Sequence, residues 1–70
     1  MKYVIYNTSA HAYVNWPGAK RAYTKDRLNA RCFSSVAAAM ADCCGDEFVV
    51  DYFSGNAMTQ SHQVVVEEED

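Results

Sequence analysis

The chain of 70 residues has little glycine, little proline and no long hydrophobic run. With three glycines and one proline, neither Gly-rich phosphate-binding motif, G-x-G-x-x-G or G-x-x-x-x-G-K, can be written in it. No apolar run approaches the roughly 20 residues that a transmembrane helix needs. The first residues, Met1–Thr8, contain no apolar segment of signal-peptide length. We therefore expect a cytoplasmic protein without a membrane span.

Cysteine is also scarce, and its number is odd. Three cysteines, two of them adjacent, do not form the even set that a disulfide framework needs. The side chains that could bind a metal are Cys32, Cys43, Cys44, His11 and His62. None of them forms the close Cys or His pairs that are typical of zinc sites. A cysteine nucleophile would need a base in contact with it, and no motif supplies one. The sequence therefore predicts a non-enzymatic protein without metal or cofactor.

Charge is sorted along the chain. All six cations lie within residues 1–35, together with one acid. Residues 36–70 carry eight acids and no cation. A small protein with such a distribution either pairs its two halves internally or presents a strong field to a partner.

Alternation of apolar and polar residues predicts strands over residues 2–7, 11–16 and 47–53, with less regular strands over 20–24 and 63–67. The alanine-rich segment 36–44 predicts a helix, with Ser34 as N-cap and Gly45 ending it. We expect Val36, Ala39, Met40 and Cys43 to face the sheet, since they share one helical face. The expected fold is α+β, with a single antiparallel β-sheet and one α-helix packed on one face. Residues 1–70 form one small domain with an acidic C-terminal end at 67–70.

The acidic half predicts a negative surface that binds a partner protein. A surface of this kind can match the Lys/Arg array with which a partner accepts phosphates. Exposed aromatic side chains would anchor it, because Tyr and Trp are enriched in interfaces. The predicted partner-binding residues are Asp42, Asp46, Glu47, Asp51, Glu67, Glu68, Glu69, Tyr13, Trp16 and Tyr52.

The basic stretch 20–31 offers an alternative, a small nucleic-acid-binding or regulatory protein. Its cations are Lys20, Arg21, Lys25, Arg27 and Arg31. Tyr13, Trp16 and Tyr23 lie in or beside this stretch and could stack on bases. The net charge of −3 argues against direct nucleic-acid binding, because such proteins are usually basic.

Several short segments together form a recognisable pattern, namely Tyr3–Asn7, Tyr13–Val14, Tyr23–Asp26 and Ala30–Ser34, leading into Ala37–Ala39. This pattern resembles one found in small phage-encoded accessory proteins. The resemblance implies an inhibitor, similar to anti-CRISPR proteins, that binds and blocks a bacterial nucleic-acid-handling protein or CRISPR effector in the host cytoplasm. It transfers no site residue, and the oligomeric state stays open, with a homodimer as one alternative.

Overall fold

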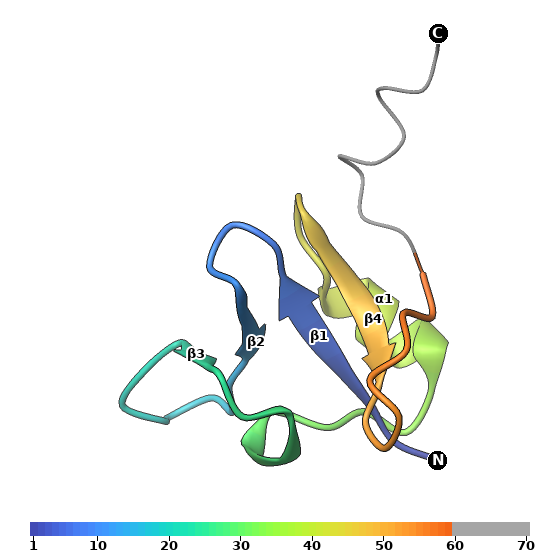
Figure 1. Ribbon diagram of the computed structural model, residues 1–70, viewed down its shortest axis with the longest axis horizontal. Helices are drawn as coiled ribbons and strands as arrows, with labels where there is room; N and C mark the ends of the chain where they lie inside the picture. Colours follow the sequence, from blue (N-terminus) through green and yellow to red (C-terminus); the bar gives the residue numbers. More distant parts are fainter. Residues whose placement is uncertain (60–70) are drawn as a thin grey trace, which may run out of the picture.

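The structure is a computed structural model, and it describes residues 1–59. It contains the strands β1 (Tyr3–Asn7), β2 (Ala12–Val14), β3 (Tyr23–Thr24) and β4 (Glu47–Asp51), the 3₁₀ helix η1 (Arg27–Asn29) and the helix α1 (Val36–Asp42). The strands form one antiparallel sheet in the order β3-β2-β1-β4 (Figure 1). The predicted α+β fold with a single sheet is confirmed. The strand predicted over residues 63–67 lies outside the described residues.

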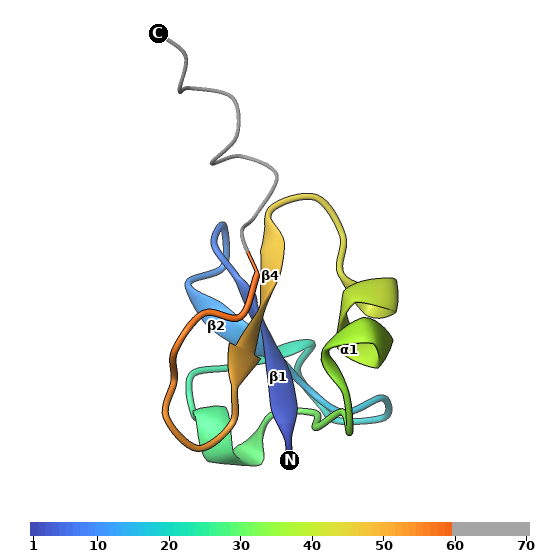
Figure 2. The ribbon, with the colours of Figure 1, turned by 90° about the vertical axis from the view of Figure 1, so that its right-hand side faces the viewer.

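The two faces of the sheet carry separate hydrophobic clusters, because successive side chains of a strand point to opposite faces. One face carries the Ile5 cluster, made of Ile5, Ala39 and Val49. The other carries the Val4 cluster, made of Val4, Ala30 and Val50. Figure 2 shows α1 on one side of the sheet and η1 with the segment after β4 on the other. At 0% and 1% exposure, Val4 and Ile5 are buried, so β1 is covered on both faces.

Strand β1 is the centre of the sheet. It pairs with β4 along its whole length, from Tyr3 opposite Asp51 to Asn7 opposite Glu47. On its other side β2 pairs only with its last two residues. At the opposite end of β1, the backbone of Phe33 exchanges hydrogen bonds of 2.9 and 2.7 Å with that of Tyr3. The four strands predicted within the described residues are therefore present, although each is shorter than its predicted range, β1 by a single residue.

Helix α1 begins at the predicted residue, Val36, but its N-cap differs by one residue and it ends two residues earlier than predicted. Ser35 is its N-cap, not Ser34, and the Ser35 hydroxyl accepts a hydrogen bond from the Ala38 N–H at 3.1 Å. The helix ends at Asp42, and its C-cap, Cys43, has extended backbone. The prediction that Gly45 ends the helix is wrong, because Gly45, at φ +53°, lies in the turn that leads into β4.

The predicted buried face of the helix is correct for three positions and wrong for the fourth. Ala39 is fully buried, and Val36 and Cys43 pack against the Ile5 cluster. Met40 was expected on the same face, yet it is 53% exposed. A helix of seven residues presents only a narrow stripe to the sheet, and the spacing of Val36, Ala39 and Cys43 fills that stripe without Met40.

Arg27 joins η1 to the segment that follows β4. Its Nε donates to the Tyr52 carbonyl at 2.8 Å, and its Nη2 donates to the Phe53 carbonyl at 3.3 Å. In return the Tyr52 hydroxyl donates to the Leu28 carbonyl at 3.2 Å. A Cβ added at Gly55, which has φ +81°, would lie 2.5 Å from the Arg27 Nη1, so this position requires glycine. Arg27 is therefore part of the fold and is not a free cation of the basic stretch.

Candidate anion-binding groove

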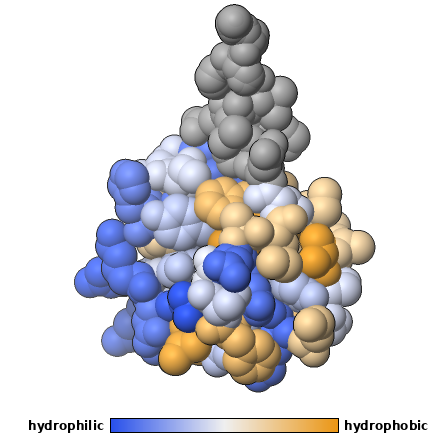
Figure 3. All heavy atoms as spheres, turned by 45° about the vertical axis from the view of Figure 1, so that its right-hand side comes forward, coloured by the Kyte–Doolittle hydropathy of each residue, from blue (hydrophilic) through white to orange (hydrophobic). Residues whose placement is uncertain are grey.

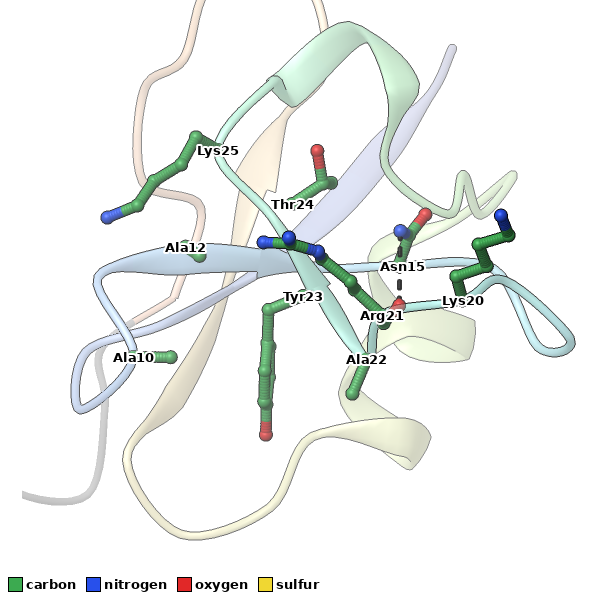
Figure 4. Close-up of a pocket in the computed structure, with 9 residues that line it drawn as sticks. All are labelled: Ala10, Ala12, Asn15, Lys20, Arg21, Ala22, Tyr23, Thr24 and Lys25. Carbon is green, nitrogen blue, oxygen red and sulfur yellow. Dashed lines mark hydrogen bonds between the residues drawn. The ribbon is translucent and has the colours of Figure 1, made fainter.

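A groove of about 620 Å³ lies beside β3, at the edge of the sheet (Figure 4). It is lined by Ala10, Ala12, Asn15, Lys20, Arg21, Ala22, Tyr23, Thr24 and Lys25. Three of these nine residues are cations and none is an acid. The alanines and Tyr23 supply the apolar part of the lining, so the groove combines positive charge with an aromatic ring.

The loop between β2 and β3 is held in place by Asn15. The Asn15 amide Nδ2 donates to the Arg21 carbonyl at 3.2 Å, and its backbone N–H donates to the Ala22 carbonyl at 2.9 Å. Its side-chain oxygen accepts from the Trp16 N–H at 2.9 Å. The turn at the tip of this loop uses Gly18 at φ +88°, a conformation that glycine accepts without strain. Asn15 thus fixes the backbone from which Lys20 and Arg21 project.

The three cations are spread along the length of the groove. Figure 4 shows Lys25 and Lys20 at opposite ends, with Arg21 between them. Lys25 reaches the carbonyl of His11 at 3.1 Å, while all three side chains are exposed. The neighbouring acid, Asp26, does not neutralise them by bonding, because its carboxylate caps η1 and accepts from Leu28 and Asn29. The described lining of the groove is therefore positively charged, which favours an anion.

Tyr23 supplies the aromatic part of the groove. It pairs with Val14, whose side chain packs against the Ile5 cluster, so Tyr23 lies on the face that carries α1. The side chain is 40% exposed. Its hydroxyl accepts a hydrogen bond from the Asn7 amide at 3.5 Å, which ties the end of the ring to β1.

The acids predicted to form a partner-binding surface are bonded within the fold. Glu47 is only 9% exposed, and its carboxylate accepts from the Asn7 amide at 2.9 Å and from the Cys44 N–H at 2.9 Å. Asp51 accepts from the Phe53 N–H at 3.1 Å and the Ser54 hydroxyl at 3.0 Å. Both carboxylates therefore have neutral donors as partners.

Asp46 and Asp42 also have partners within the fold. The Asp46 carboxylate accepts from the backbone N–H and the hydroxyl of Ser9, and the hydrogen bond from this hydroxyl lowers the pKa of Asp46 below its ordinary value of 3.8. Asp42 forms an ion pair with Arg31 at 3.1 Å, the one salt bridge between the residues that the structure describes. The remaining predicted acids, Glu67–Glu69, lie outside those residues.

The three predicted aromatic anchors are not equivalent. Tyr13 is half-buried on the face opposite α1, where its ring meets Tyr6 edge to face at 5.1 Å. Tyr52 is half-buried, and the Lys2 ammonium lies 5.1 Å from the centre of its ring. Trp16 is 49% exposed in the loop beside the groove. Tyr13 and Glu47 project from opposite faces of the sheet, so the structure does not gather the predicted residues into one surface.

The potential metal ligands are also separated. Cys32 packs against the Val4 cluster and Cys43 against the Ile5 cluster, so the sheet lies between them. Burial, with a further contribution from Glu47, raises the pKa of the Cys43 thiol to about 11. Within residues 1–59 no three His, Cys, Asp or Glu side chains come together to hold a metal ion. His62 lies outside this range.

Comparisons with protein-family models, with curated proteins and with solved structures find no match to this chain. The same described residues contain no helix with the length and apolarity to cross a membrane. Figure 3 shows one face of the molecule, with hydrophilic residues gathered on the left of the view and hydrophobic residues in the centre and on the right.

Proposed function

We propose that the chain is a non-enzymatic nucleic-acid-binding protein that uses the groove beside β3. The observation that carries this proposal is the lining of the groove, whose nine described residues include Lys20, Arg21 and Lys25 and no acid. Phosphate contacts from Lys and Arg supply most of the affinity of such proteins. The alternative predicted from the basic stretch thereby becomes the preferred function, although the stretch that serves it ends at Lys25.

The net charge of −3 does not oppose this proposal as strongly as the sequence predicted. Four of the nine acids belong to residues 67–70, and residues 1–59 carry six cations against five acids. Those five acids keep their negative charge, but none of them is among the nine described residues that line the groove. A local field decides the binding of a ligand within about one Debye length, roughly 8–10 Å.

The salt dependence of binding tests the proposal. We would measure fluorescence anisotropy of a labelled oligonucleotide of about 12 nucleotides, a length within the range of known single-strand sites. Three phosphate contacts predict a slope of roughly −2 for log K against log salt concentration. Arg21→Gln should reduce the magnitude of that slope by about 0.7. Absence of salt-dependent binding by the folded protein would contradict the proposed function.

Lys2→Gln is the matched control. It removes the same charge from a residue whose ammonium lies over the Tyr52 ring and which does not line the groove. We expect this variant to bind like the unchanged protein. Equal losses from Arg21→Gln and Lys2→Gln would mean that only the total charge matters, and the groove would not be the site.

The binding-and-blocking function predicted from the sequence is a second candidate. Its specific support is the apolar surface near the Arg27 contacts, where Leu28 is 57% exposed and Phe53 is 66% exposed. Exposed apolar side chains of this size can anchor a protein partner. The test is inhibition of DNA binding by a purified CRISPR effector complex on addition of the chain. Phe53→Ser should abolish inhibition, and an unimpaired effector would contradict this candidate.

A further inference from the structure

We infer that the groove takes a single strand of nucleic acid and that the Tyr23 ring is the surface on which a base stacks. The inference rests on the proposed function and adds the form of the ligand and the residue that recognises it. Proteins that bind single strands combine a cationic path for the backbone with aromatic side chains for the bases. Tyr23 is the aromatic residue among the nine that line the groove.

One end of the Tyr23 ring is oriented by a neighbouring side chain before any ligand binds. Its hydroxyl accepts a long hydrogen bond, at 3.5 Å, from the Asn7 amide. Asn7 is itself only 8% exposed and is fixed by Glu47 at 2.9 Å and by the Ala10 N–H at 2.8 Å. A ring that is already ordered loses little conformational entropy on binding. Since 40% of Tyr23 stays exposed, this ordered ring is still accessible to a base.

The cations lie where a strand passing the ring would place its phosphates. Arg21 lies two residues before Tyr23 and Lys25 two residues after it, while Lys20 marks the far end of the groove. In Figure 4 the Tyr23 ring points down in the view, whereas the Arg21 and Lys25 side chains both extend to the left. The Tyr23 ring can therefore contact a base while the cations contact phosphates of the same strand.

A duplex fits this site less well. The major groove of DNA admits an α-helix or a two-stranded ribbon. No helical residue lines the groove, and β2 is not part of a free ribbon. Ala12 and Tyr13 pair with β1, and the Val14 carbonyl accepts from Arg31 at 3.1 Å. Only phosphate contacts would remain for a duplex, whereas a single strand adds a stacked base.

Basic residues at a sheet edge have another established use, which is to prevent edge-to-edge pairing between molecules. Strand β3 is a short edge strand, so Lys20, Arg21 and Lys25 fit that use as well. The two uses differ in what they require of Tyr23. Edge protection needs no accessible ring beside the charges, and it predicts no preference for bases over phosphates.

The experiment compares three probes of equal length: a single-stranded DNA oligonucleotide, the same strand with abasic sites in place of its bases, and the duplex. The abasic strand keeps the phosphates and removes the stacking. We expect the folded, full-length protein to bind the single strand roughly tenfold more tightly than the abasic strand or the duplex. The emission of Trp16, the single tryptophan of the chain, gives a second readout without a label.

Two variants at Tyr23 assign that preference to the ring. Tyr23→Leu should lose the roughly tenfold preference for the strand with bases and leave abasic binding unchanged. Tyr23→Phe keeps the ring and should retain most of the preference. Thermal melts confirm that each variant is folded.

The outcomes separate the inference from the proposed function. Equal binding of the normal and abasic strands would overturn stacking on Tyr23 and leave the proposed function standing. Failure of all three nucleic-acid probes to bind would overturn both, and so would tighter binding of polyglutamate than of any nucleic acid. Retention of the preference in Tyr23→Leu would overturn the role of this residue.

Discussion

Residues 20–25 and residues 42–51 use their charges in opposite ways. In the first region Lys20, Arg21 and Lys25 are exposed around a groove with no acid among the residues described in its lining. In the second region all four acids accept hydrogen bonds or an ion pair inside the fold. Carboxylates are acceptors that can satisfy backbone N–H groups at turns and strand ends, whereas a lysine ammonium can only donate. A chain with sorted charge therefore need not pair its two halves with each other.

The largest effect on stability is expected from replacing Glu47. Removing its carboxylate by Glu47→Ala leaves the buried Asn7 amide and the Cys44 N–H without their acceptor. We expect the free energy of unfolding to fall by about 2–3 kcal/mol, measured by urea denaturation. Glu47→Gln keeps one acceptor oxygen and should lose less. A loss no greater than that of an exposed acid would show that Glu47 is not part of the fold's polar core.

Replacing Asp46 should lower the free energy of unfolding less than replacing Glu47, because Asp46 is more exposed. The size of this effect should depend on pH. Its folded pKa is lowered, so its carboxylate contributes stability above the ordinary value of 3.8. That contribution is lost as the pH falls below 3.8 through the lowered folded value. Between about pH 5 and pH 3, we expect urea midpoints of the unchanged protein to fall more than those of Asp46→Asn. Parallel decreases would contradict the assigned hydrogen bonds from Ser9.

The ion pair between Arg31 and Asp42 should contribute little. Both side chains are partly exposed, at 35% and 45%, and pairs of this kind are worth about 0–1 kcal/mol. Asp42→Asn should lower the thermal midpoint slightly at low salt and hardly at all at high salt. A large loss of stability that persists in high salt would show that this acid has a role beyond the pair with Arg31.

The smallest expected effect concerns residues 67–70, whose four acids repel an anionic ligand by their charge alone. Deleting them should strengthen oligonucleotide binding a few-fold at low salt, and the difference should shrink as salt is added. The acidic-surface hypothesis predicts the opposite result for a protein partner, namely weaker binding after the deletion. Measuring both on one truncated variant sharpens the contrast between the two proposed functions.

The strands of this fold could be predicted from sequence, because alternation along residues 3–7 and 47–51 records two buried faces. The phase of the helix could be predicted in part. The shared face of Val36, Ala39 and Cys43 packs on the sheet as expected, whereas the exposure of Met40 follows only from how the short helix docks on Ile5 and Val49.

The groove was predictable only in part. Lys20, Arg21, Lys25 and Tyr23 were evident as a basic stretch with an aromatic residue, but Ala10, Ala12 and Asn15 carry no signal of their own. The hydrogen-bond partners of the acids could not be predicted either. The Glu47 carboxylate accepts from the Asn7 amide, which is 40 residues away in the sequence, and this contact exists only once β1 and β4 are paired.

The central position of β1 has a consequence for the order in which this protein folds during synthesis. Its pairing partners in β4 are made about 40 residues later, which takes roughly 2–8 s at ribosomal rates of 5–20 residues per second. Until then β1 has the two-residue pairing with β2 and the backbone hydrogen bonds between Tyr3 and Phe33, and a lone hairpin is marginal in water. The sheet is therefore completed only after β4 has been made, and contacts of such high sequence separation form slowly.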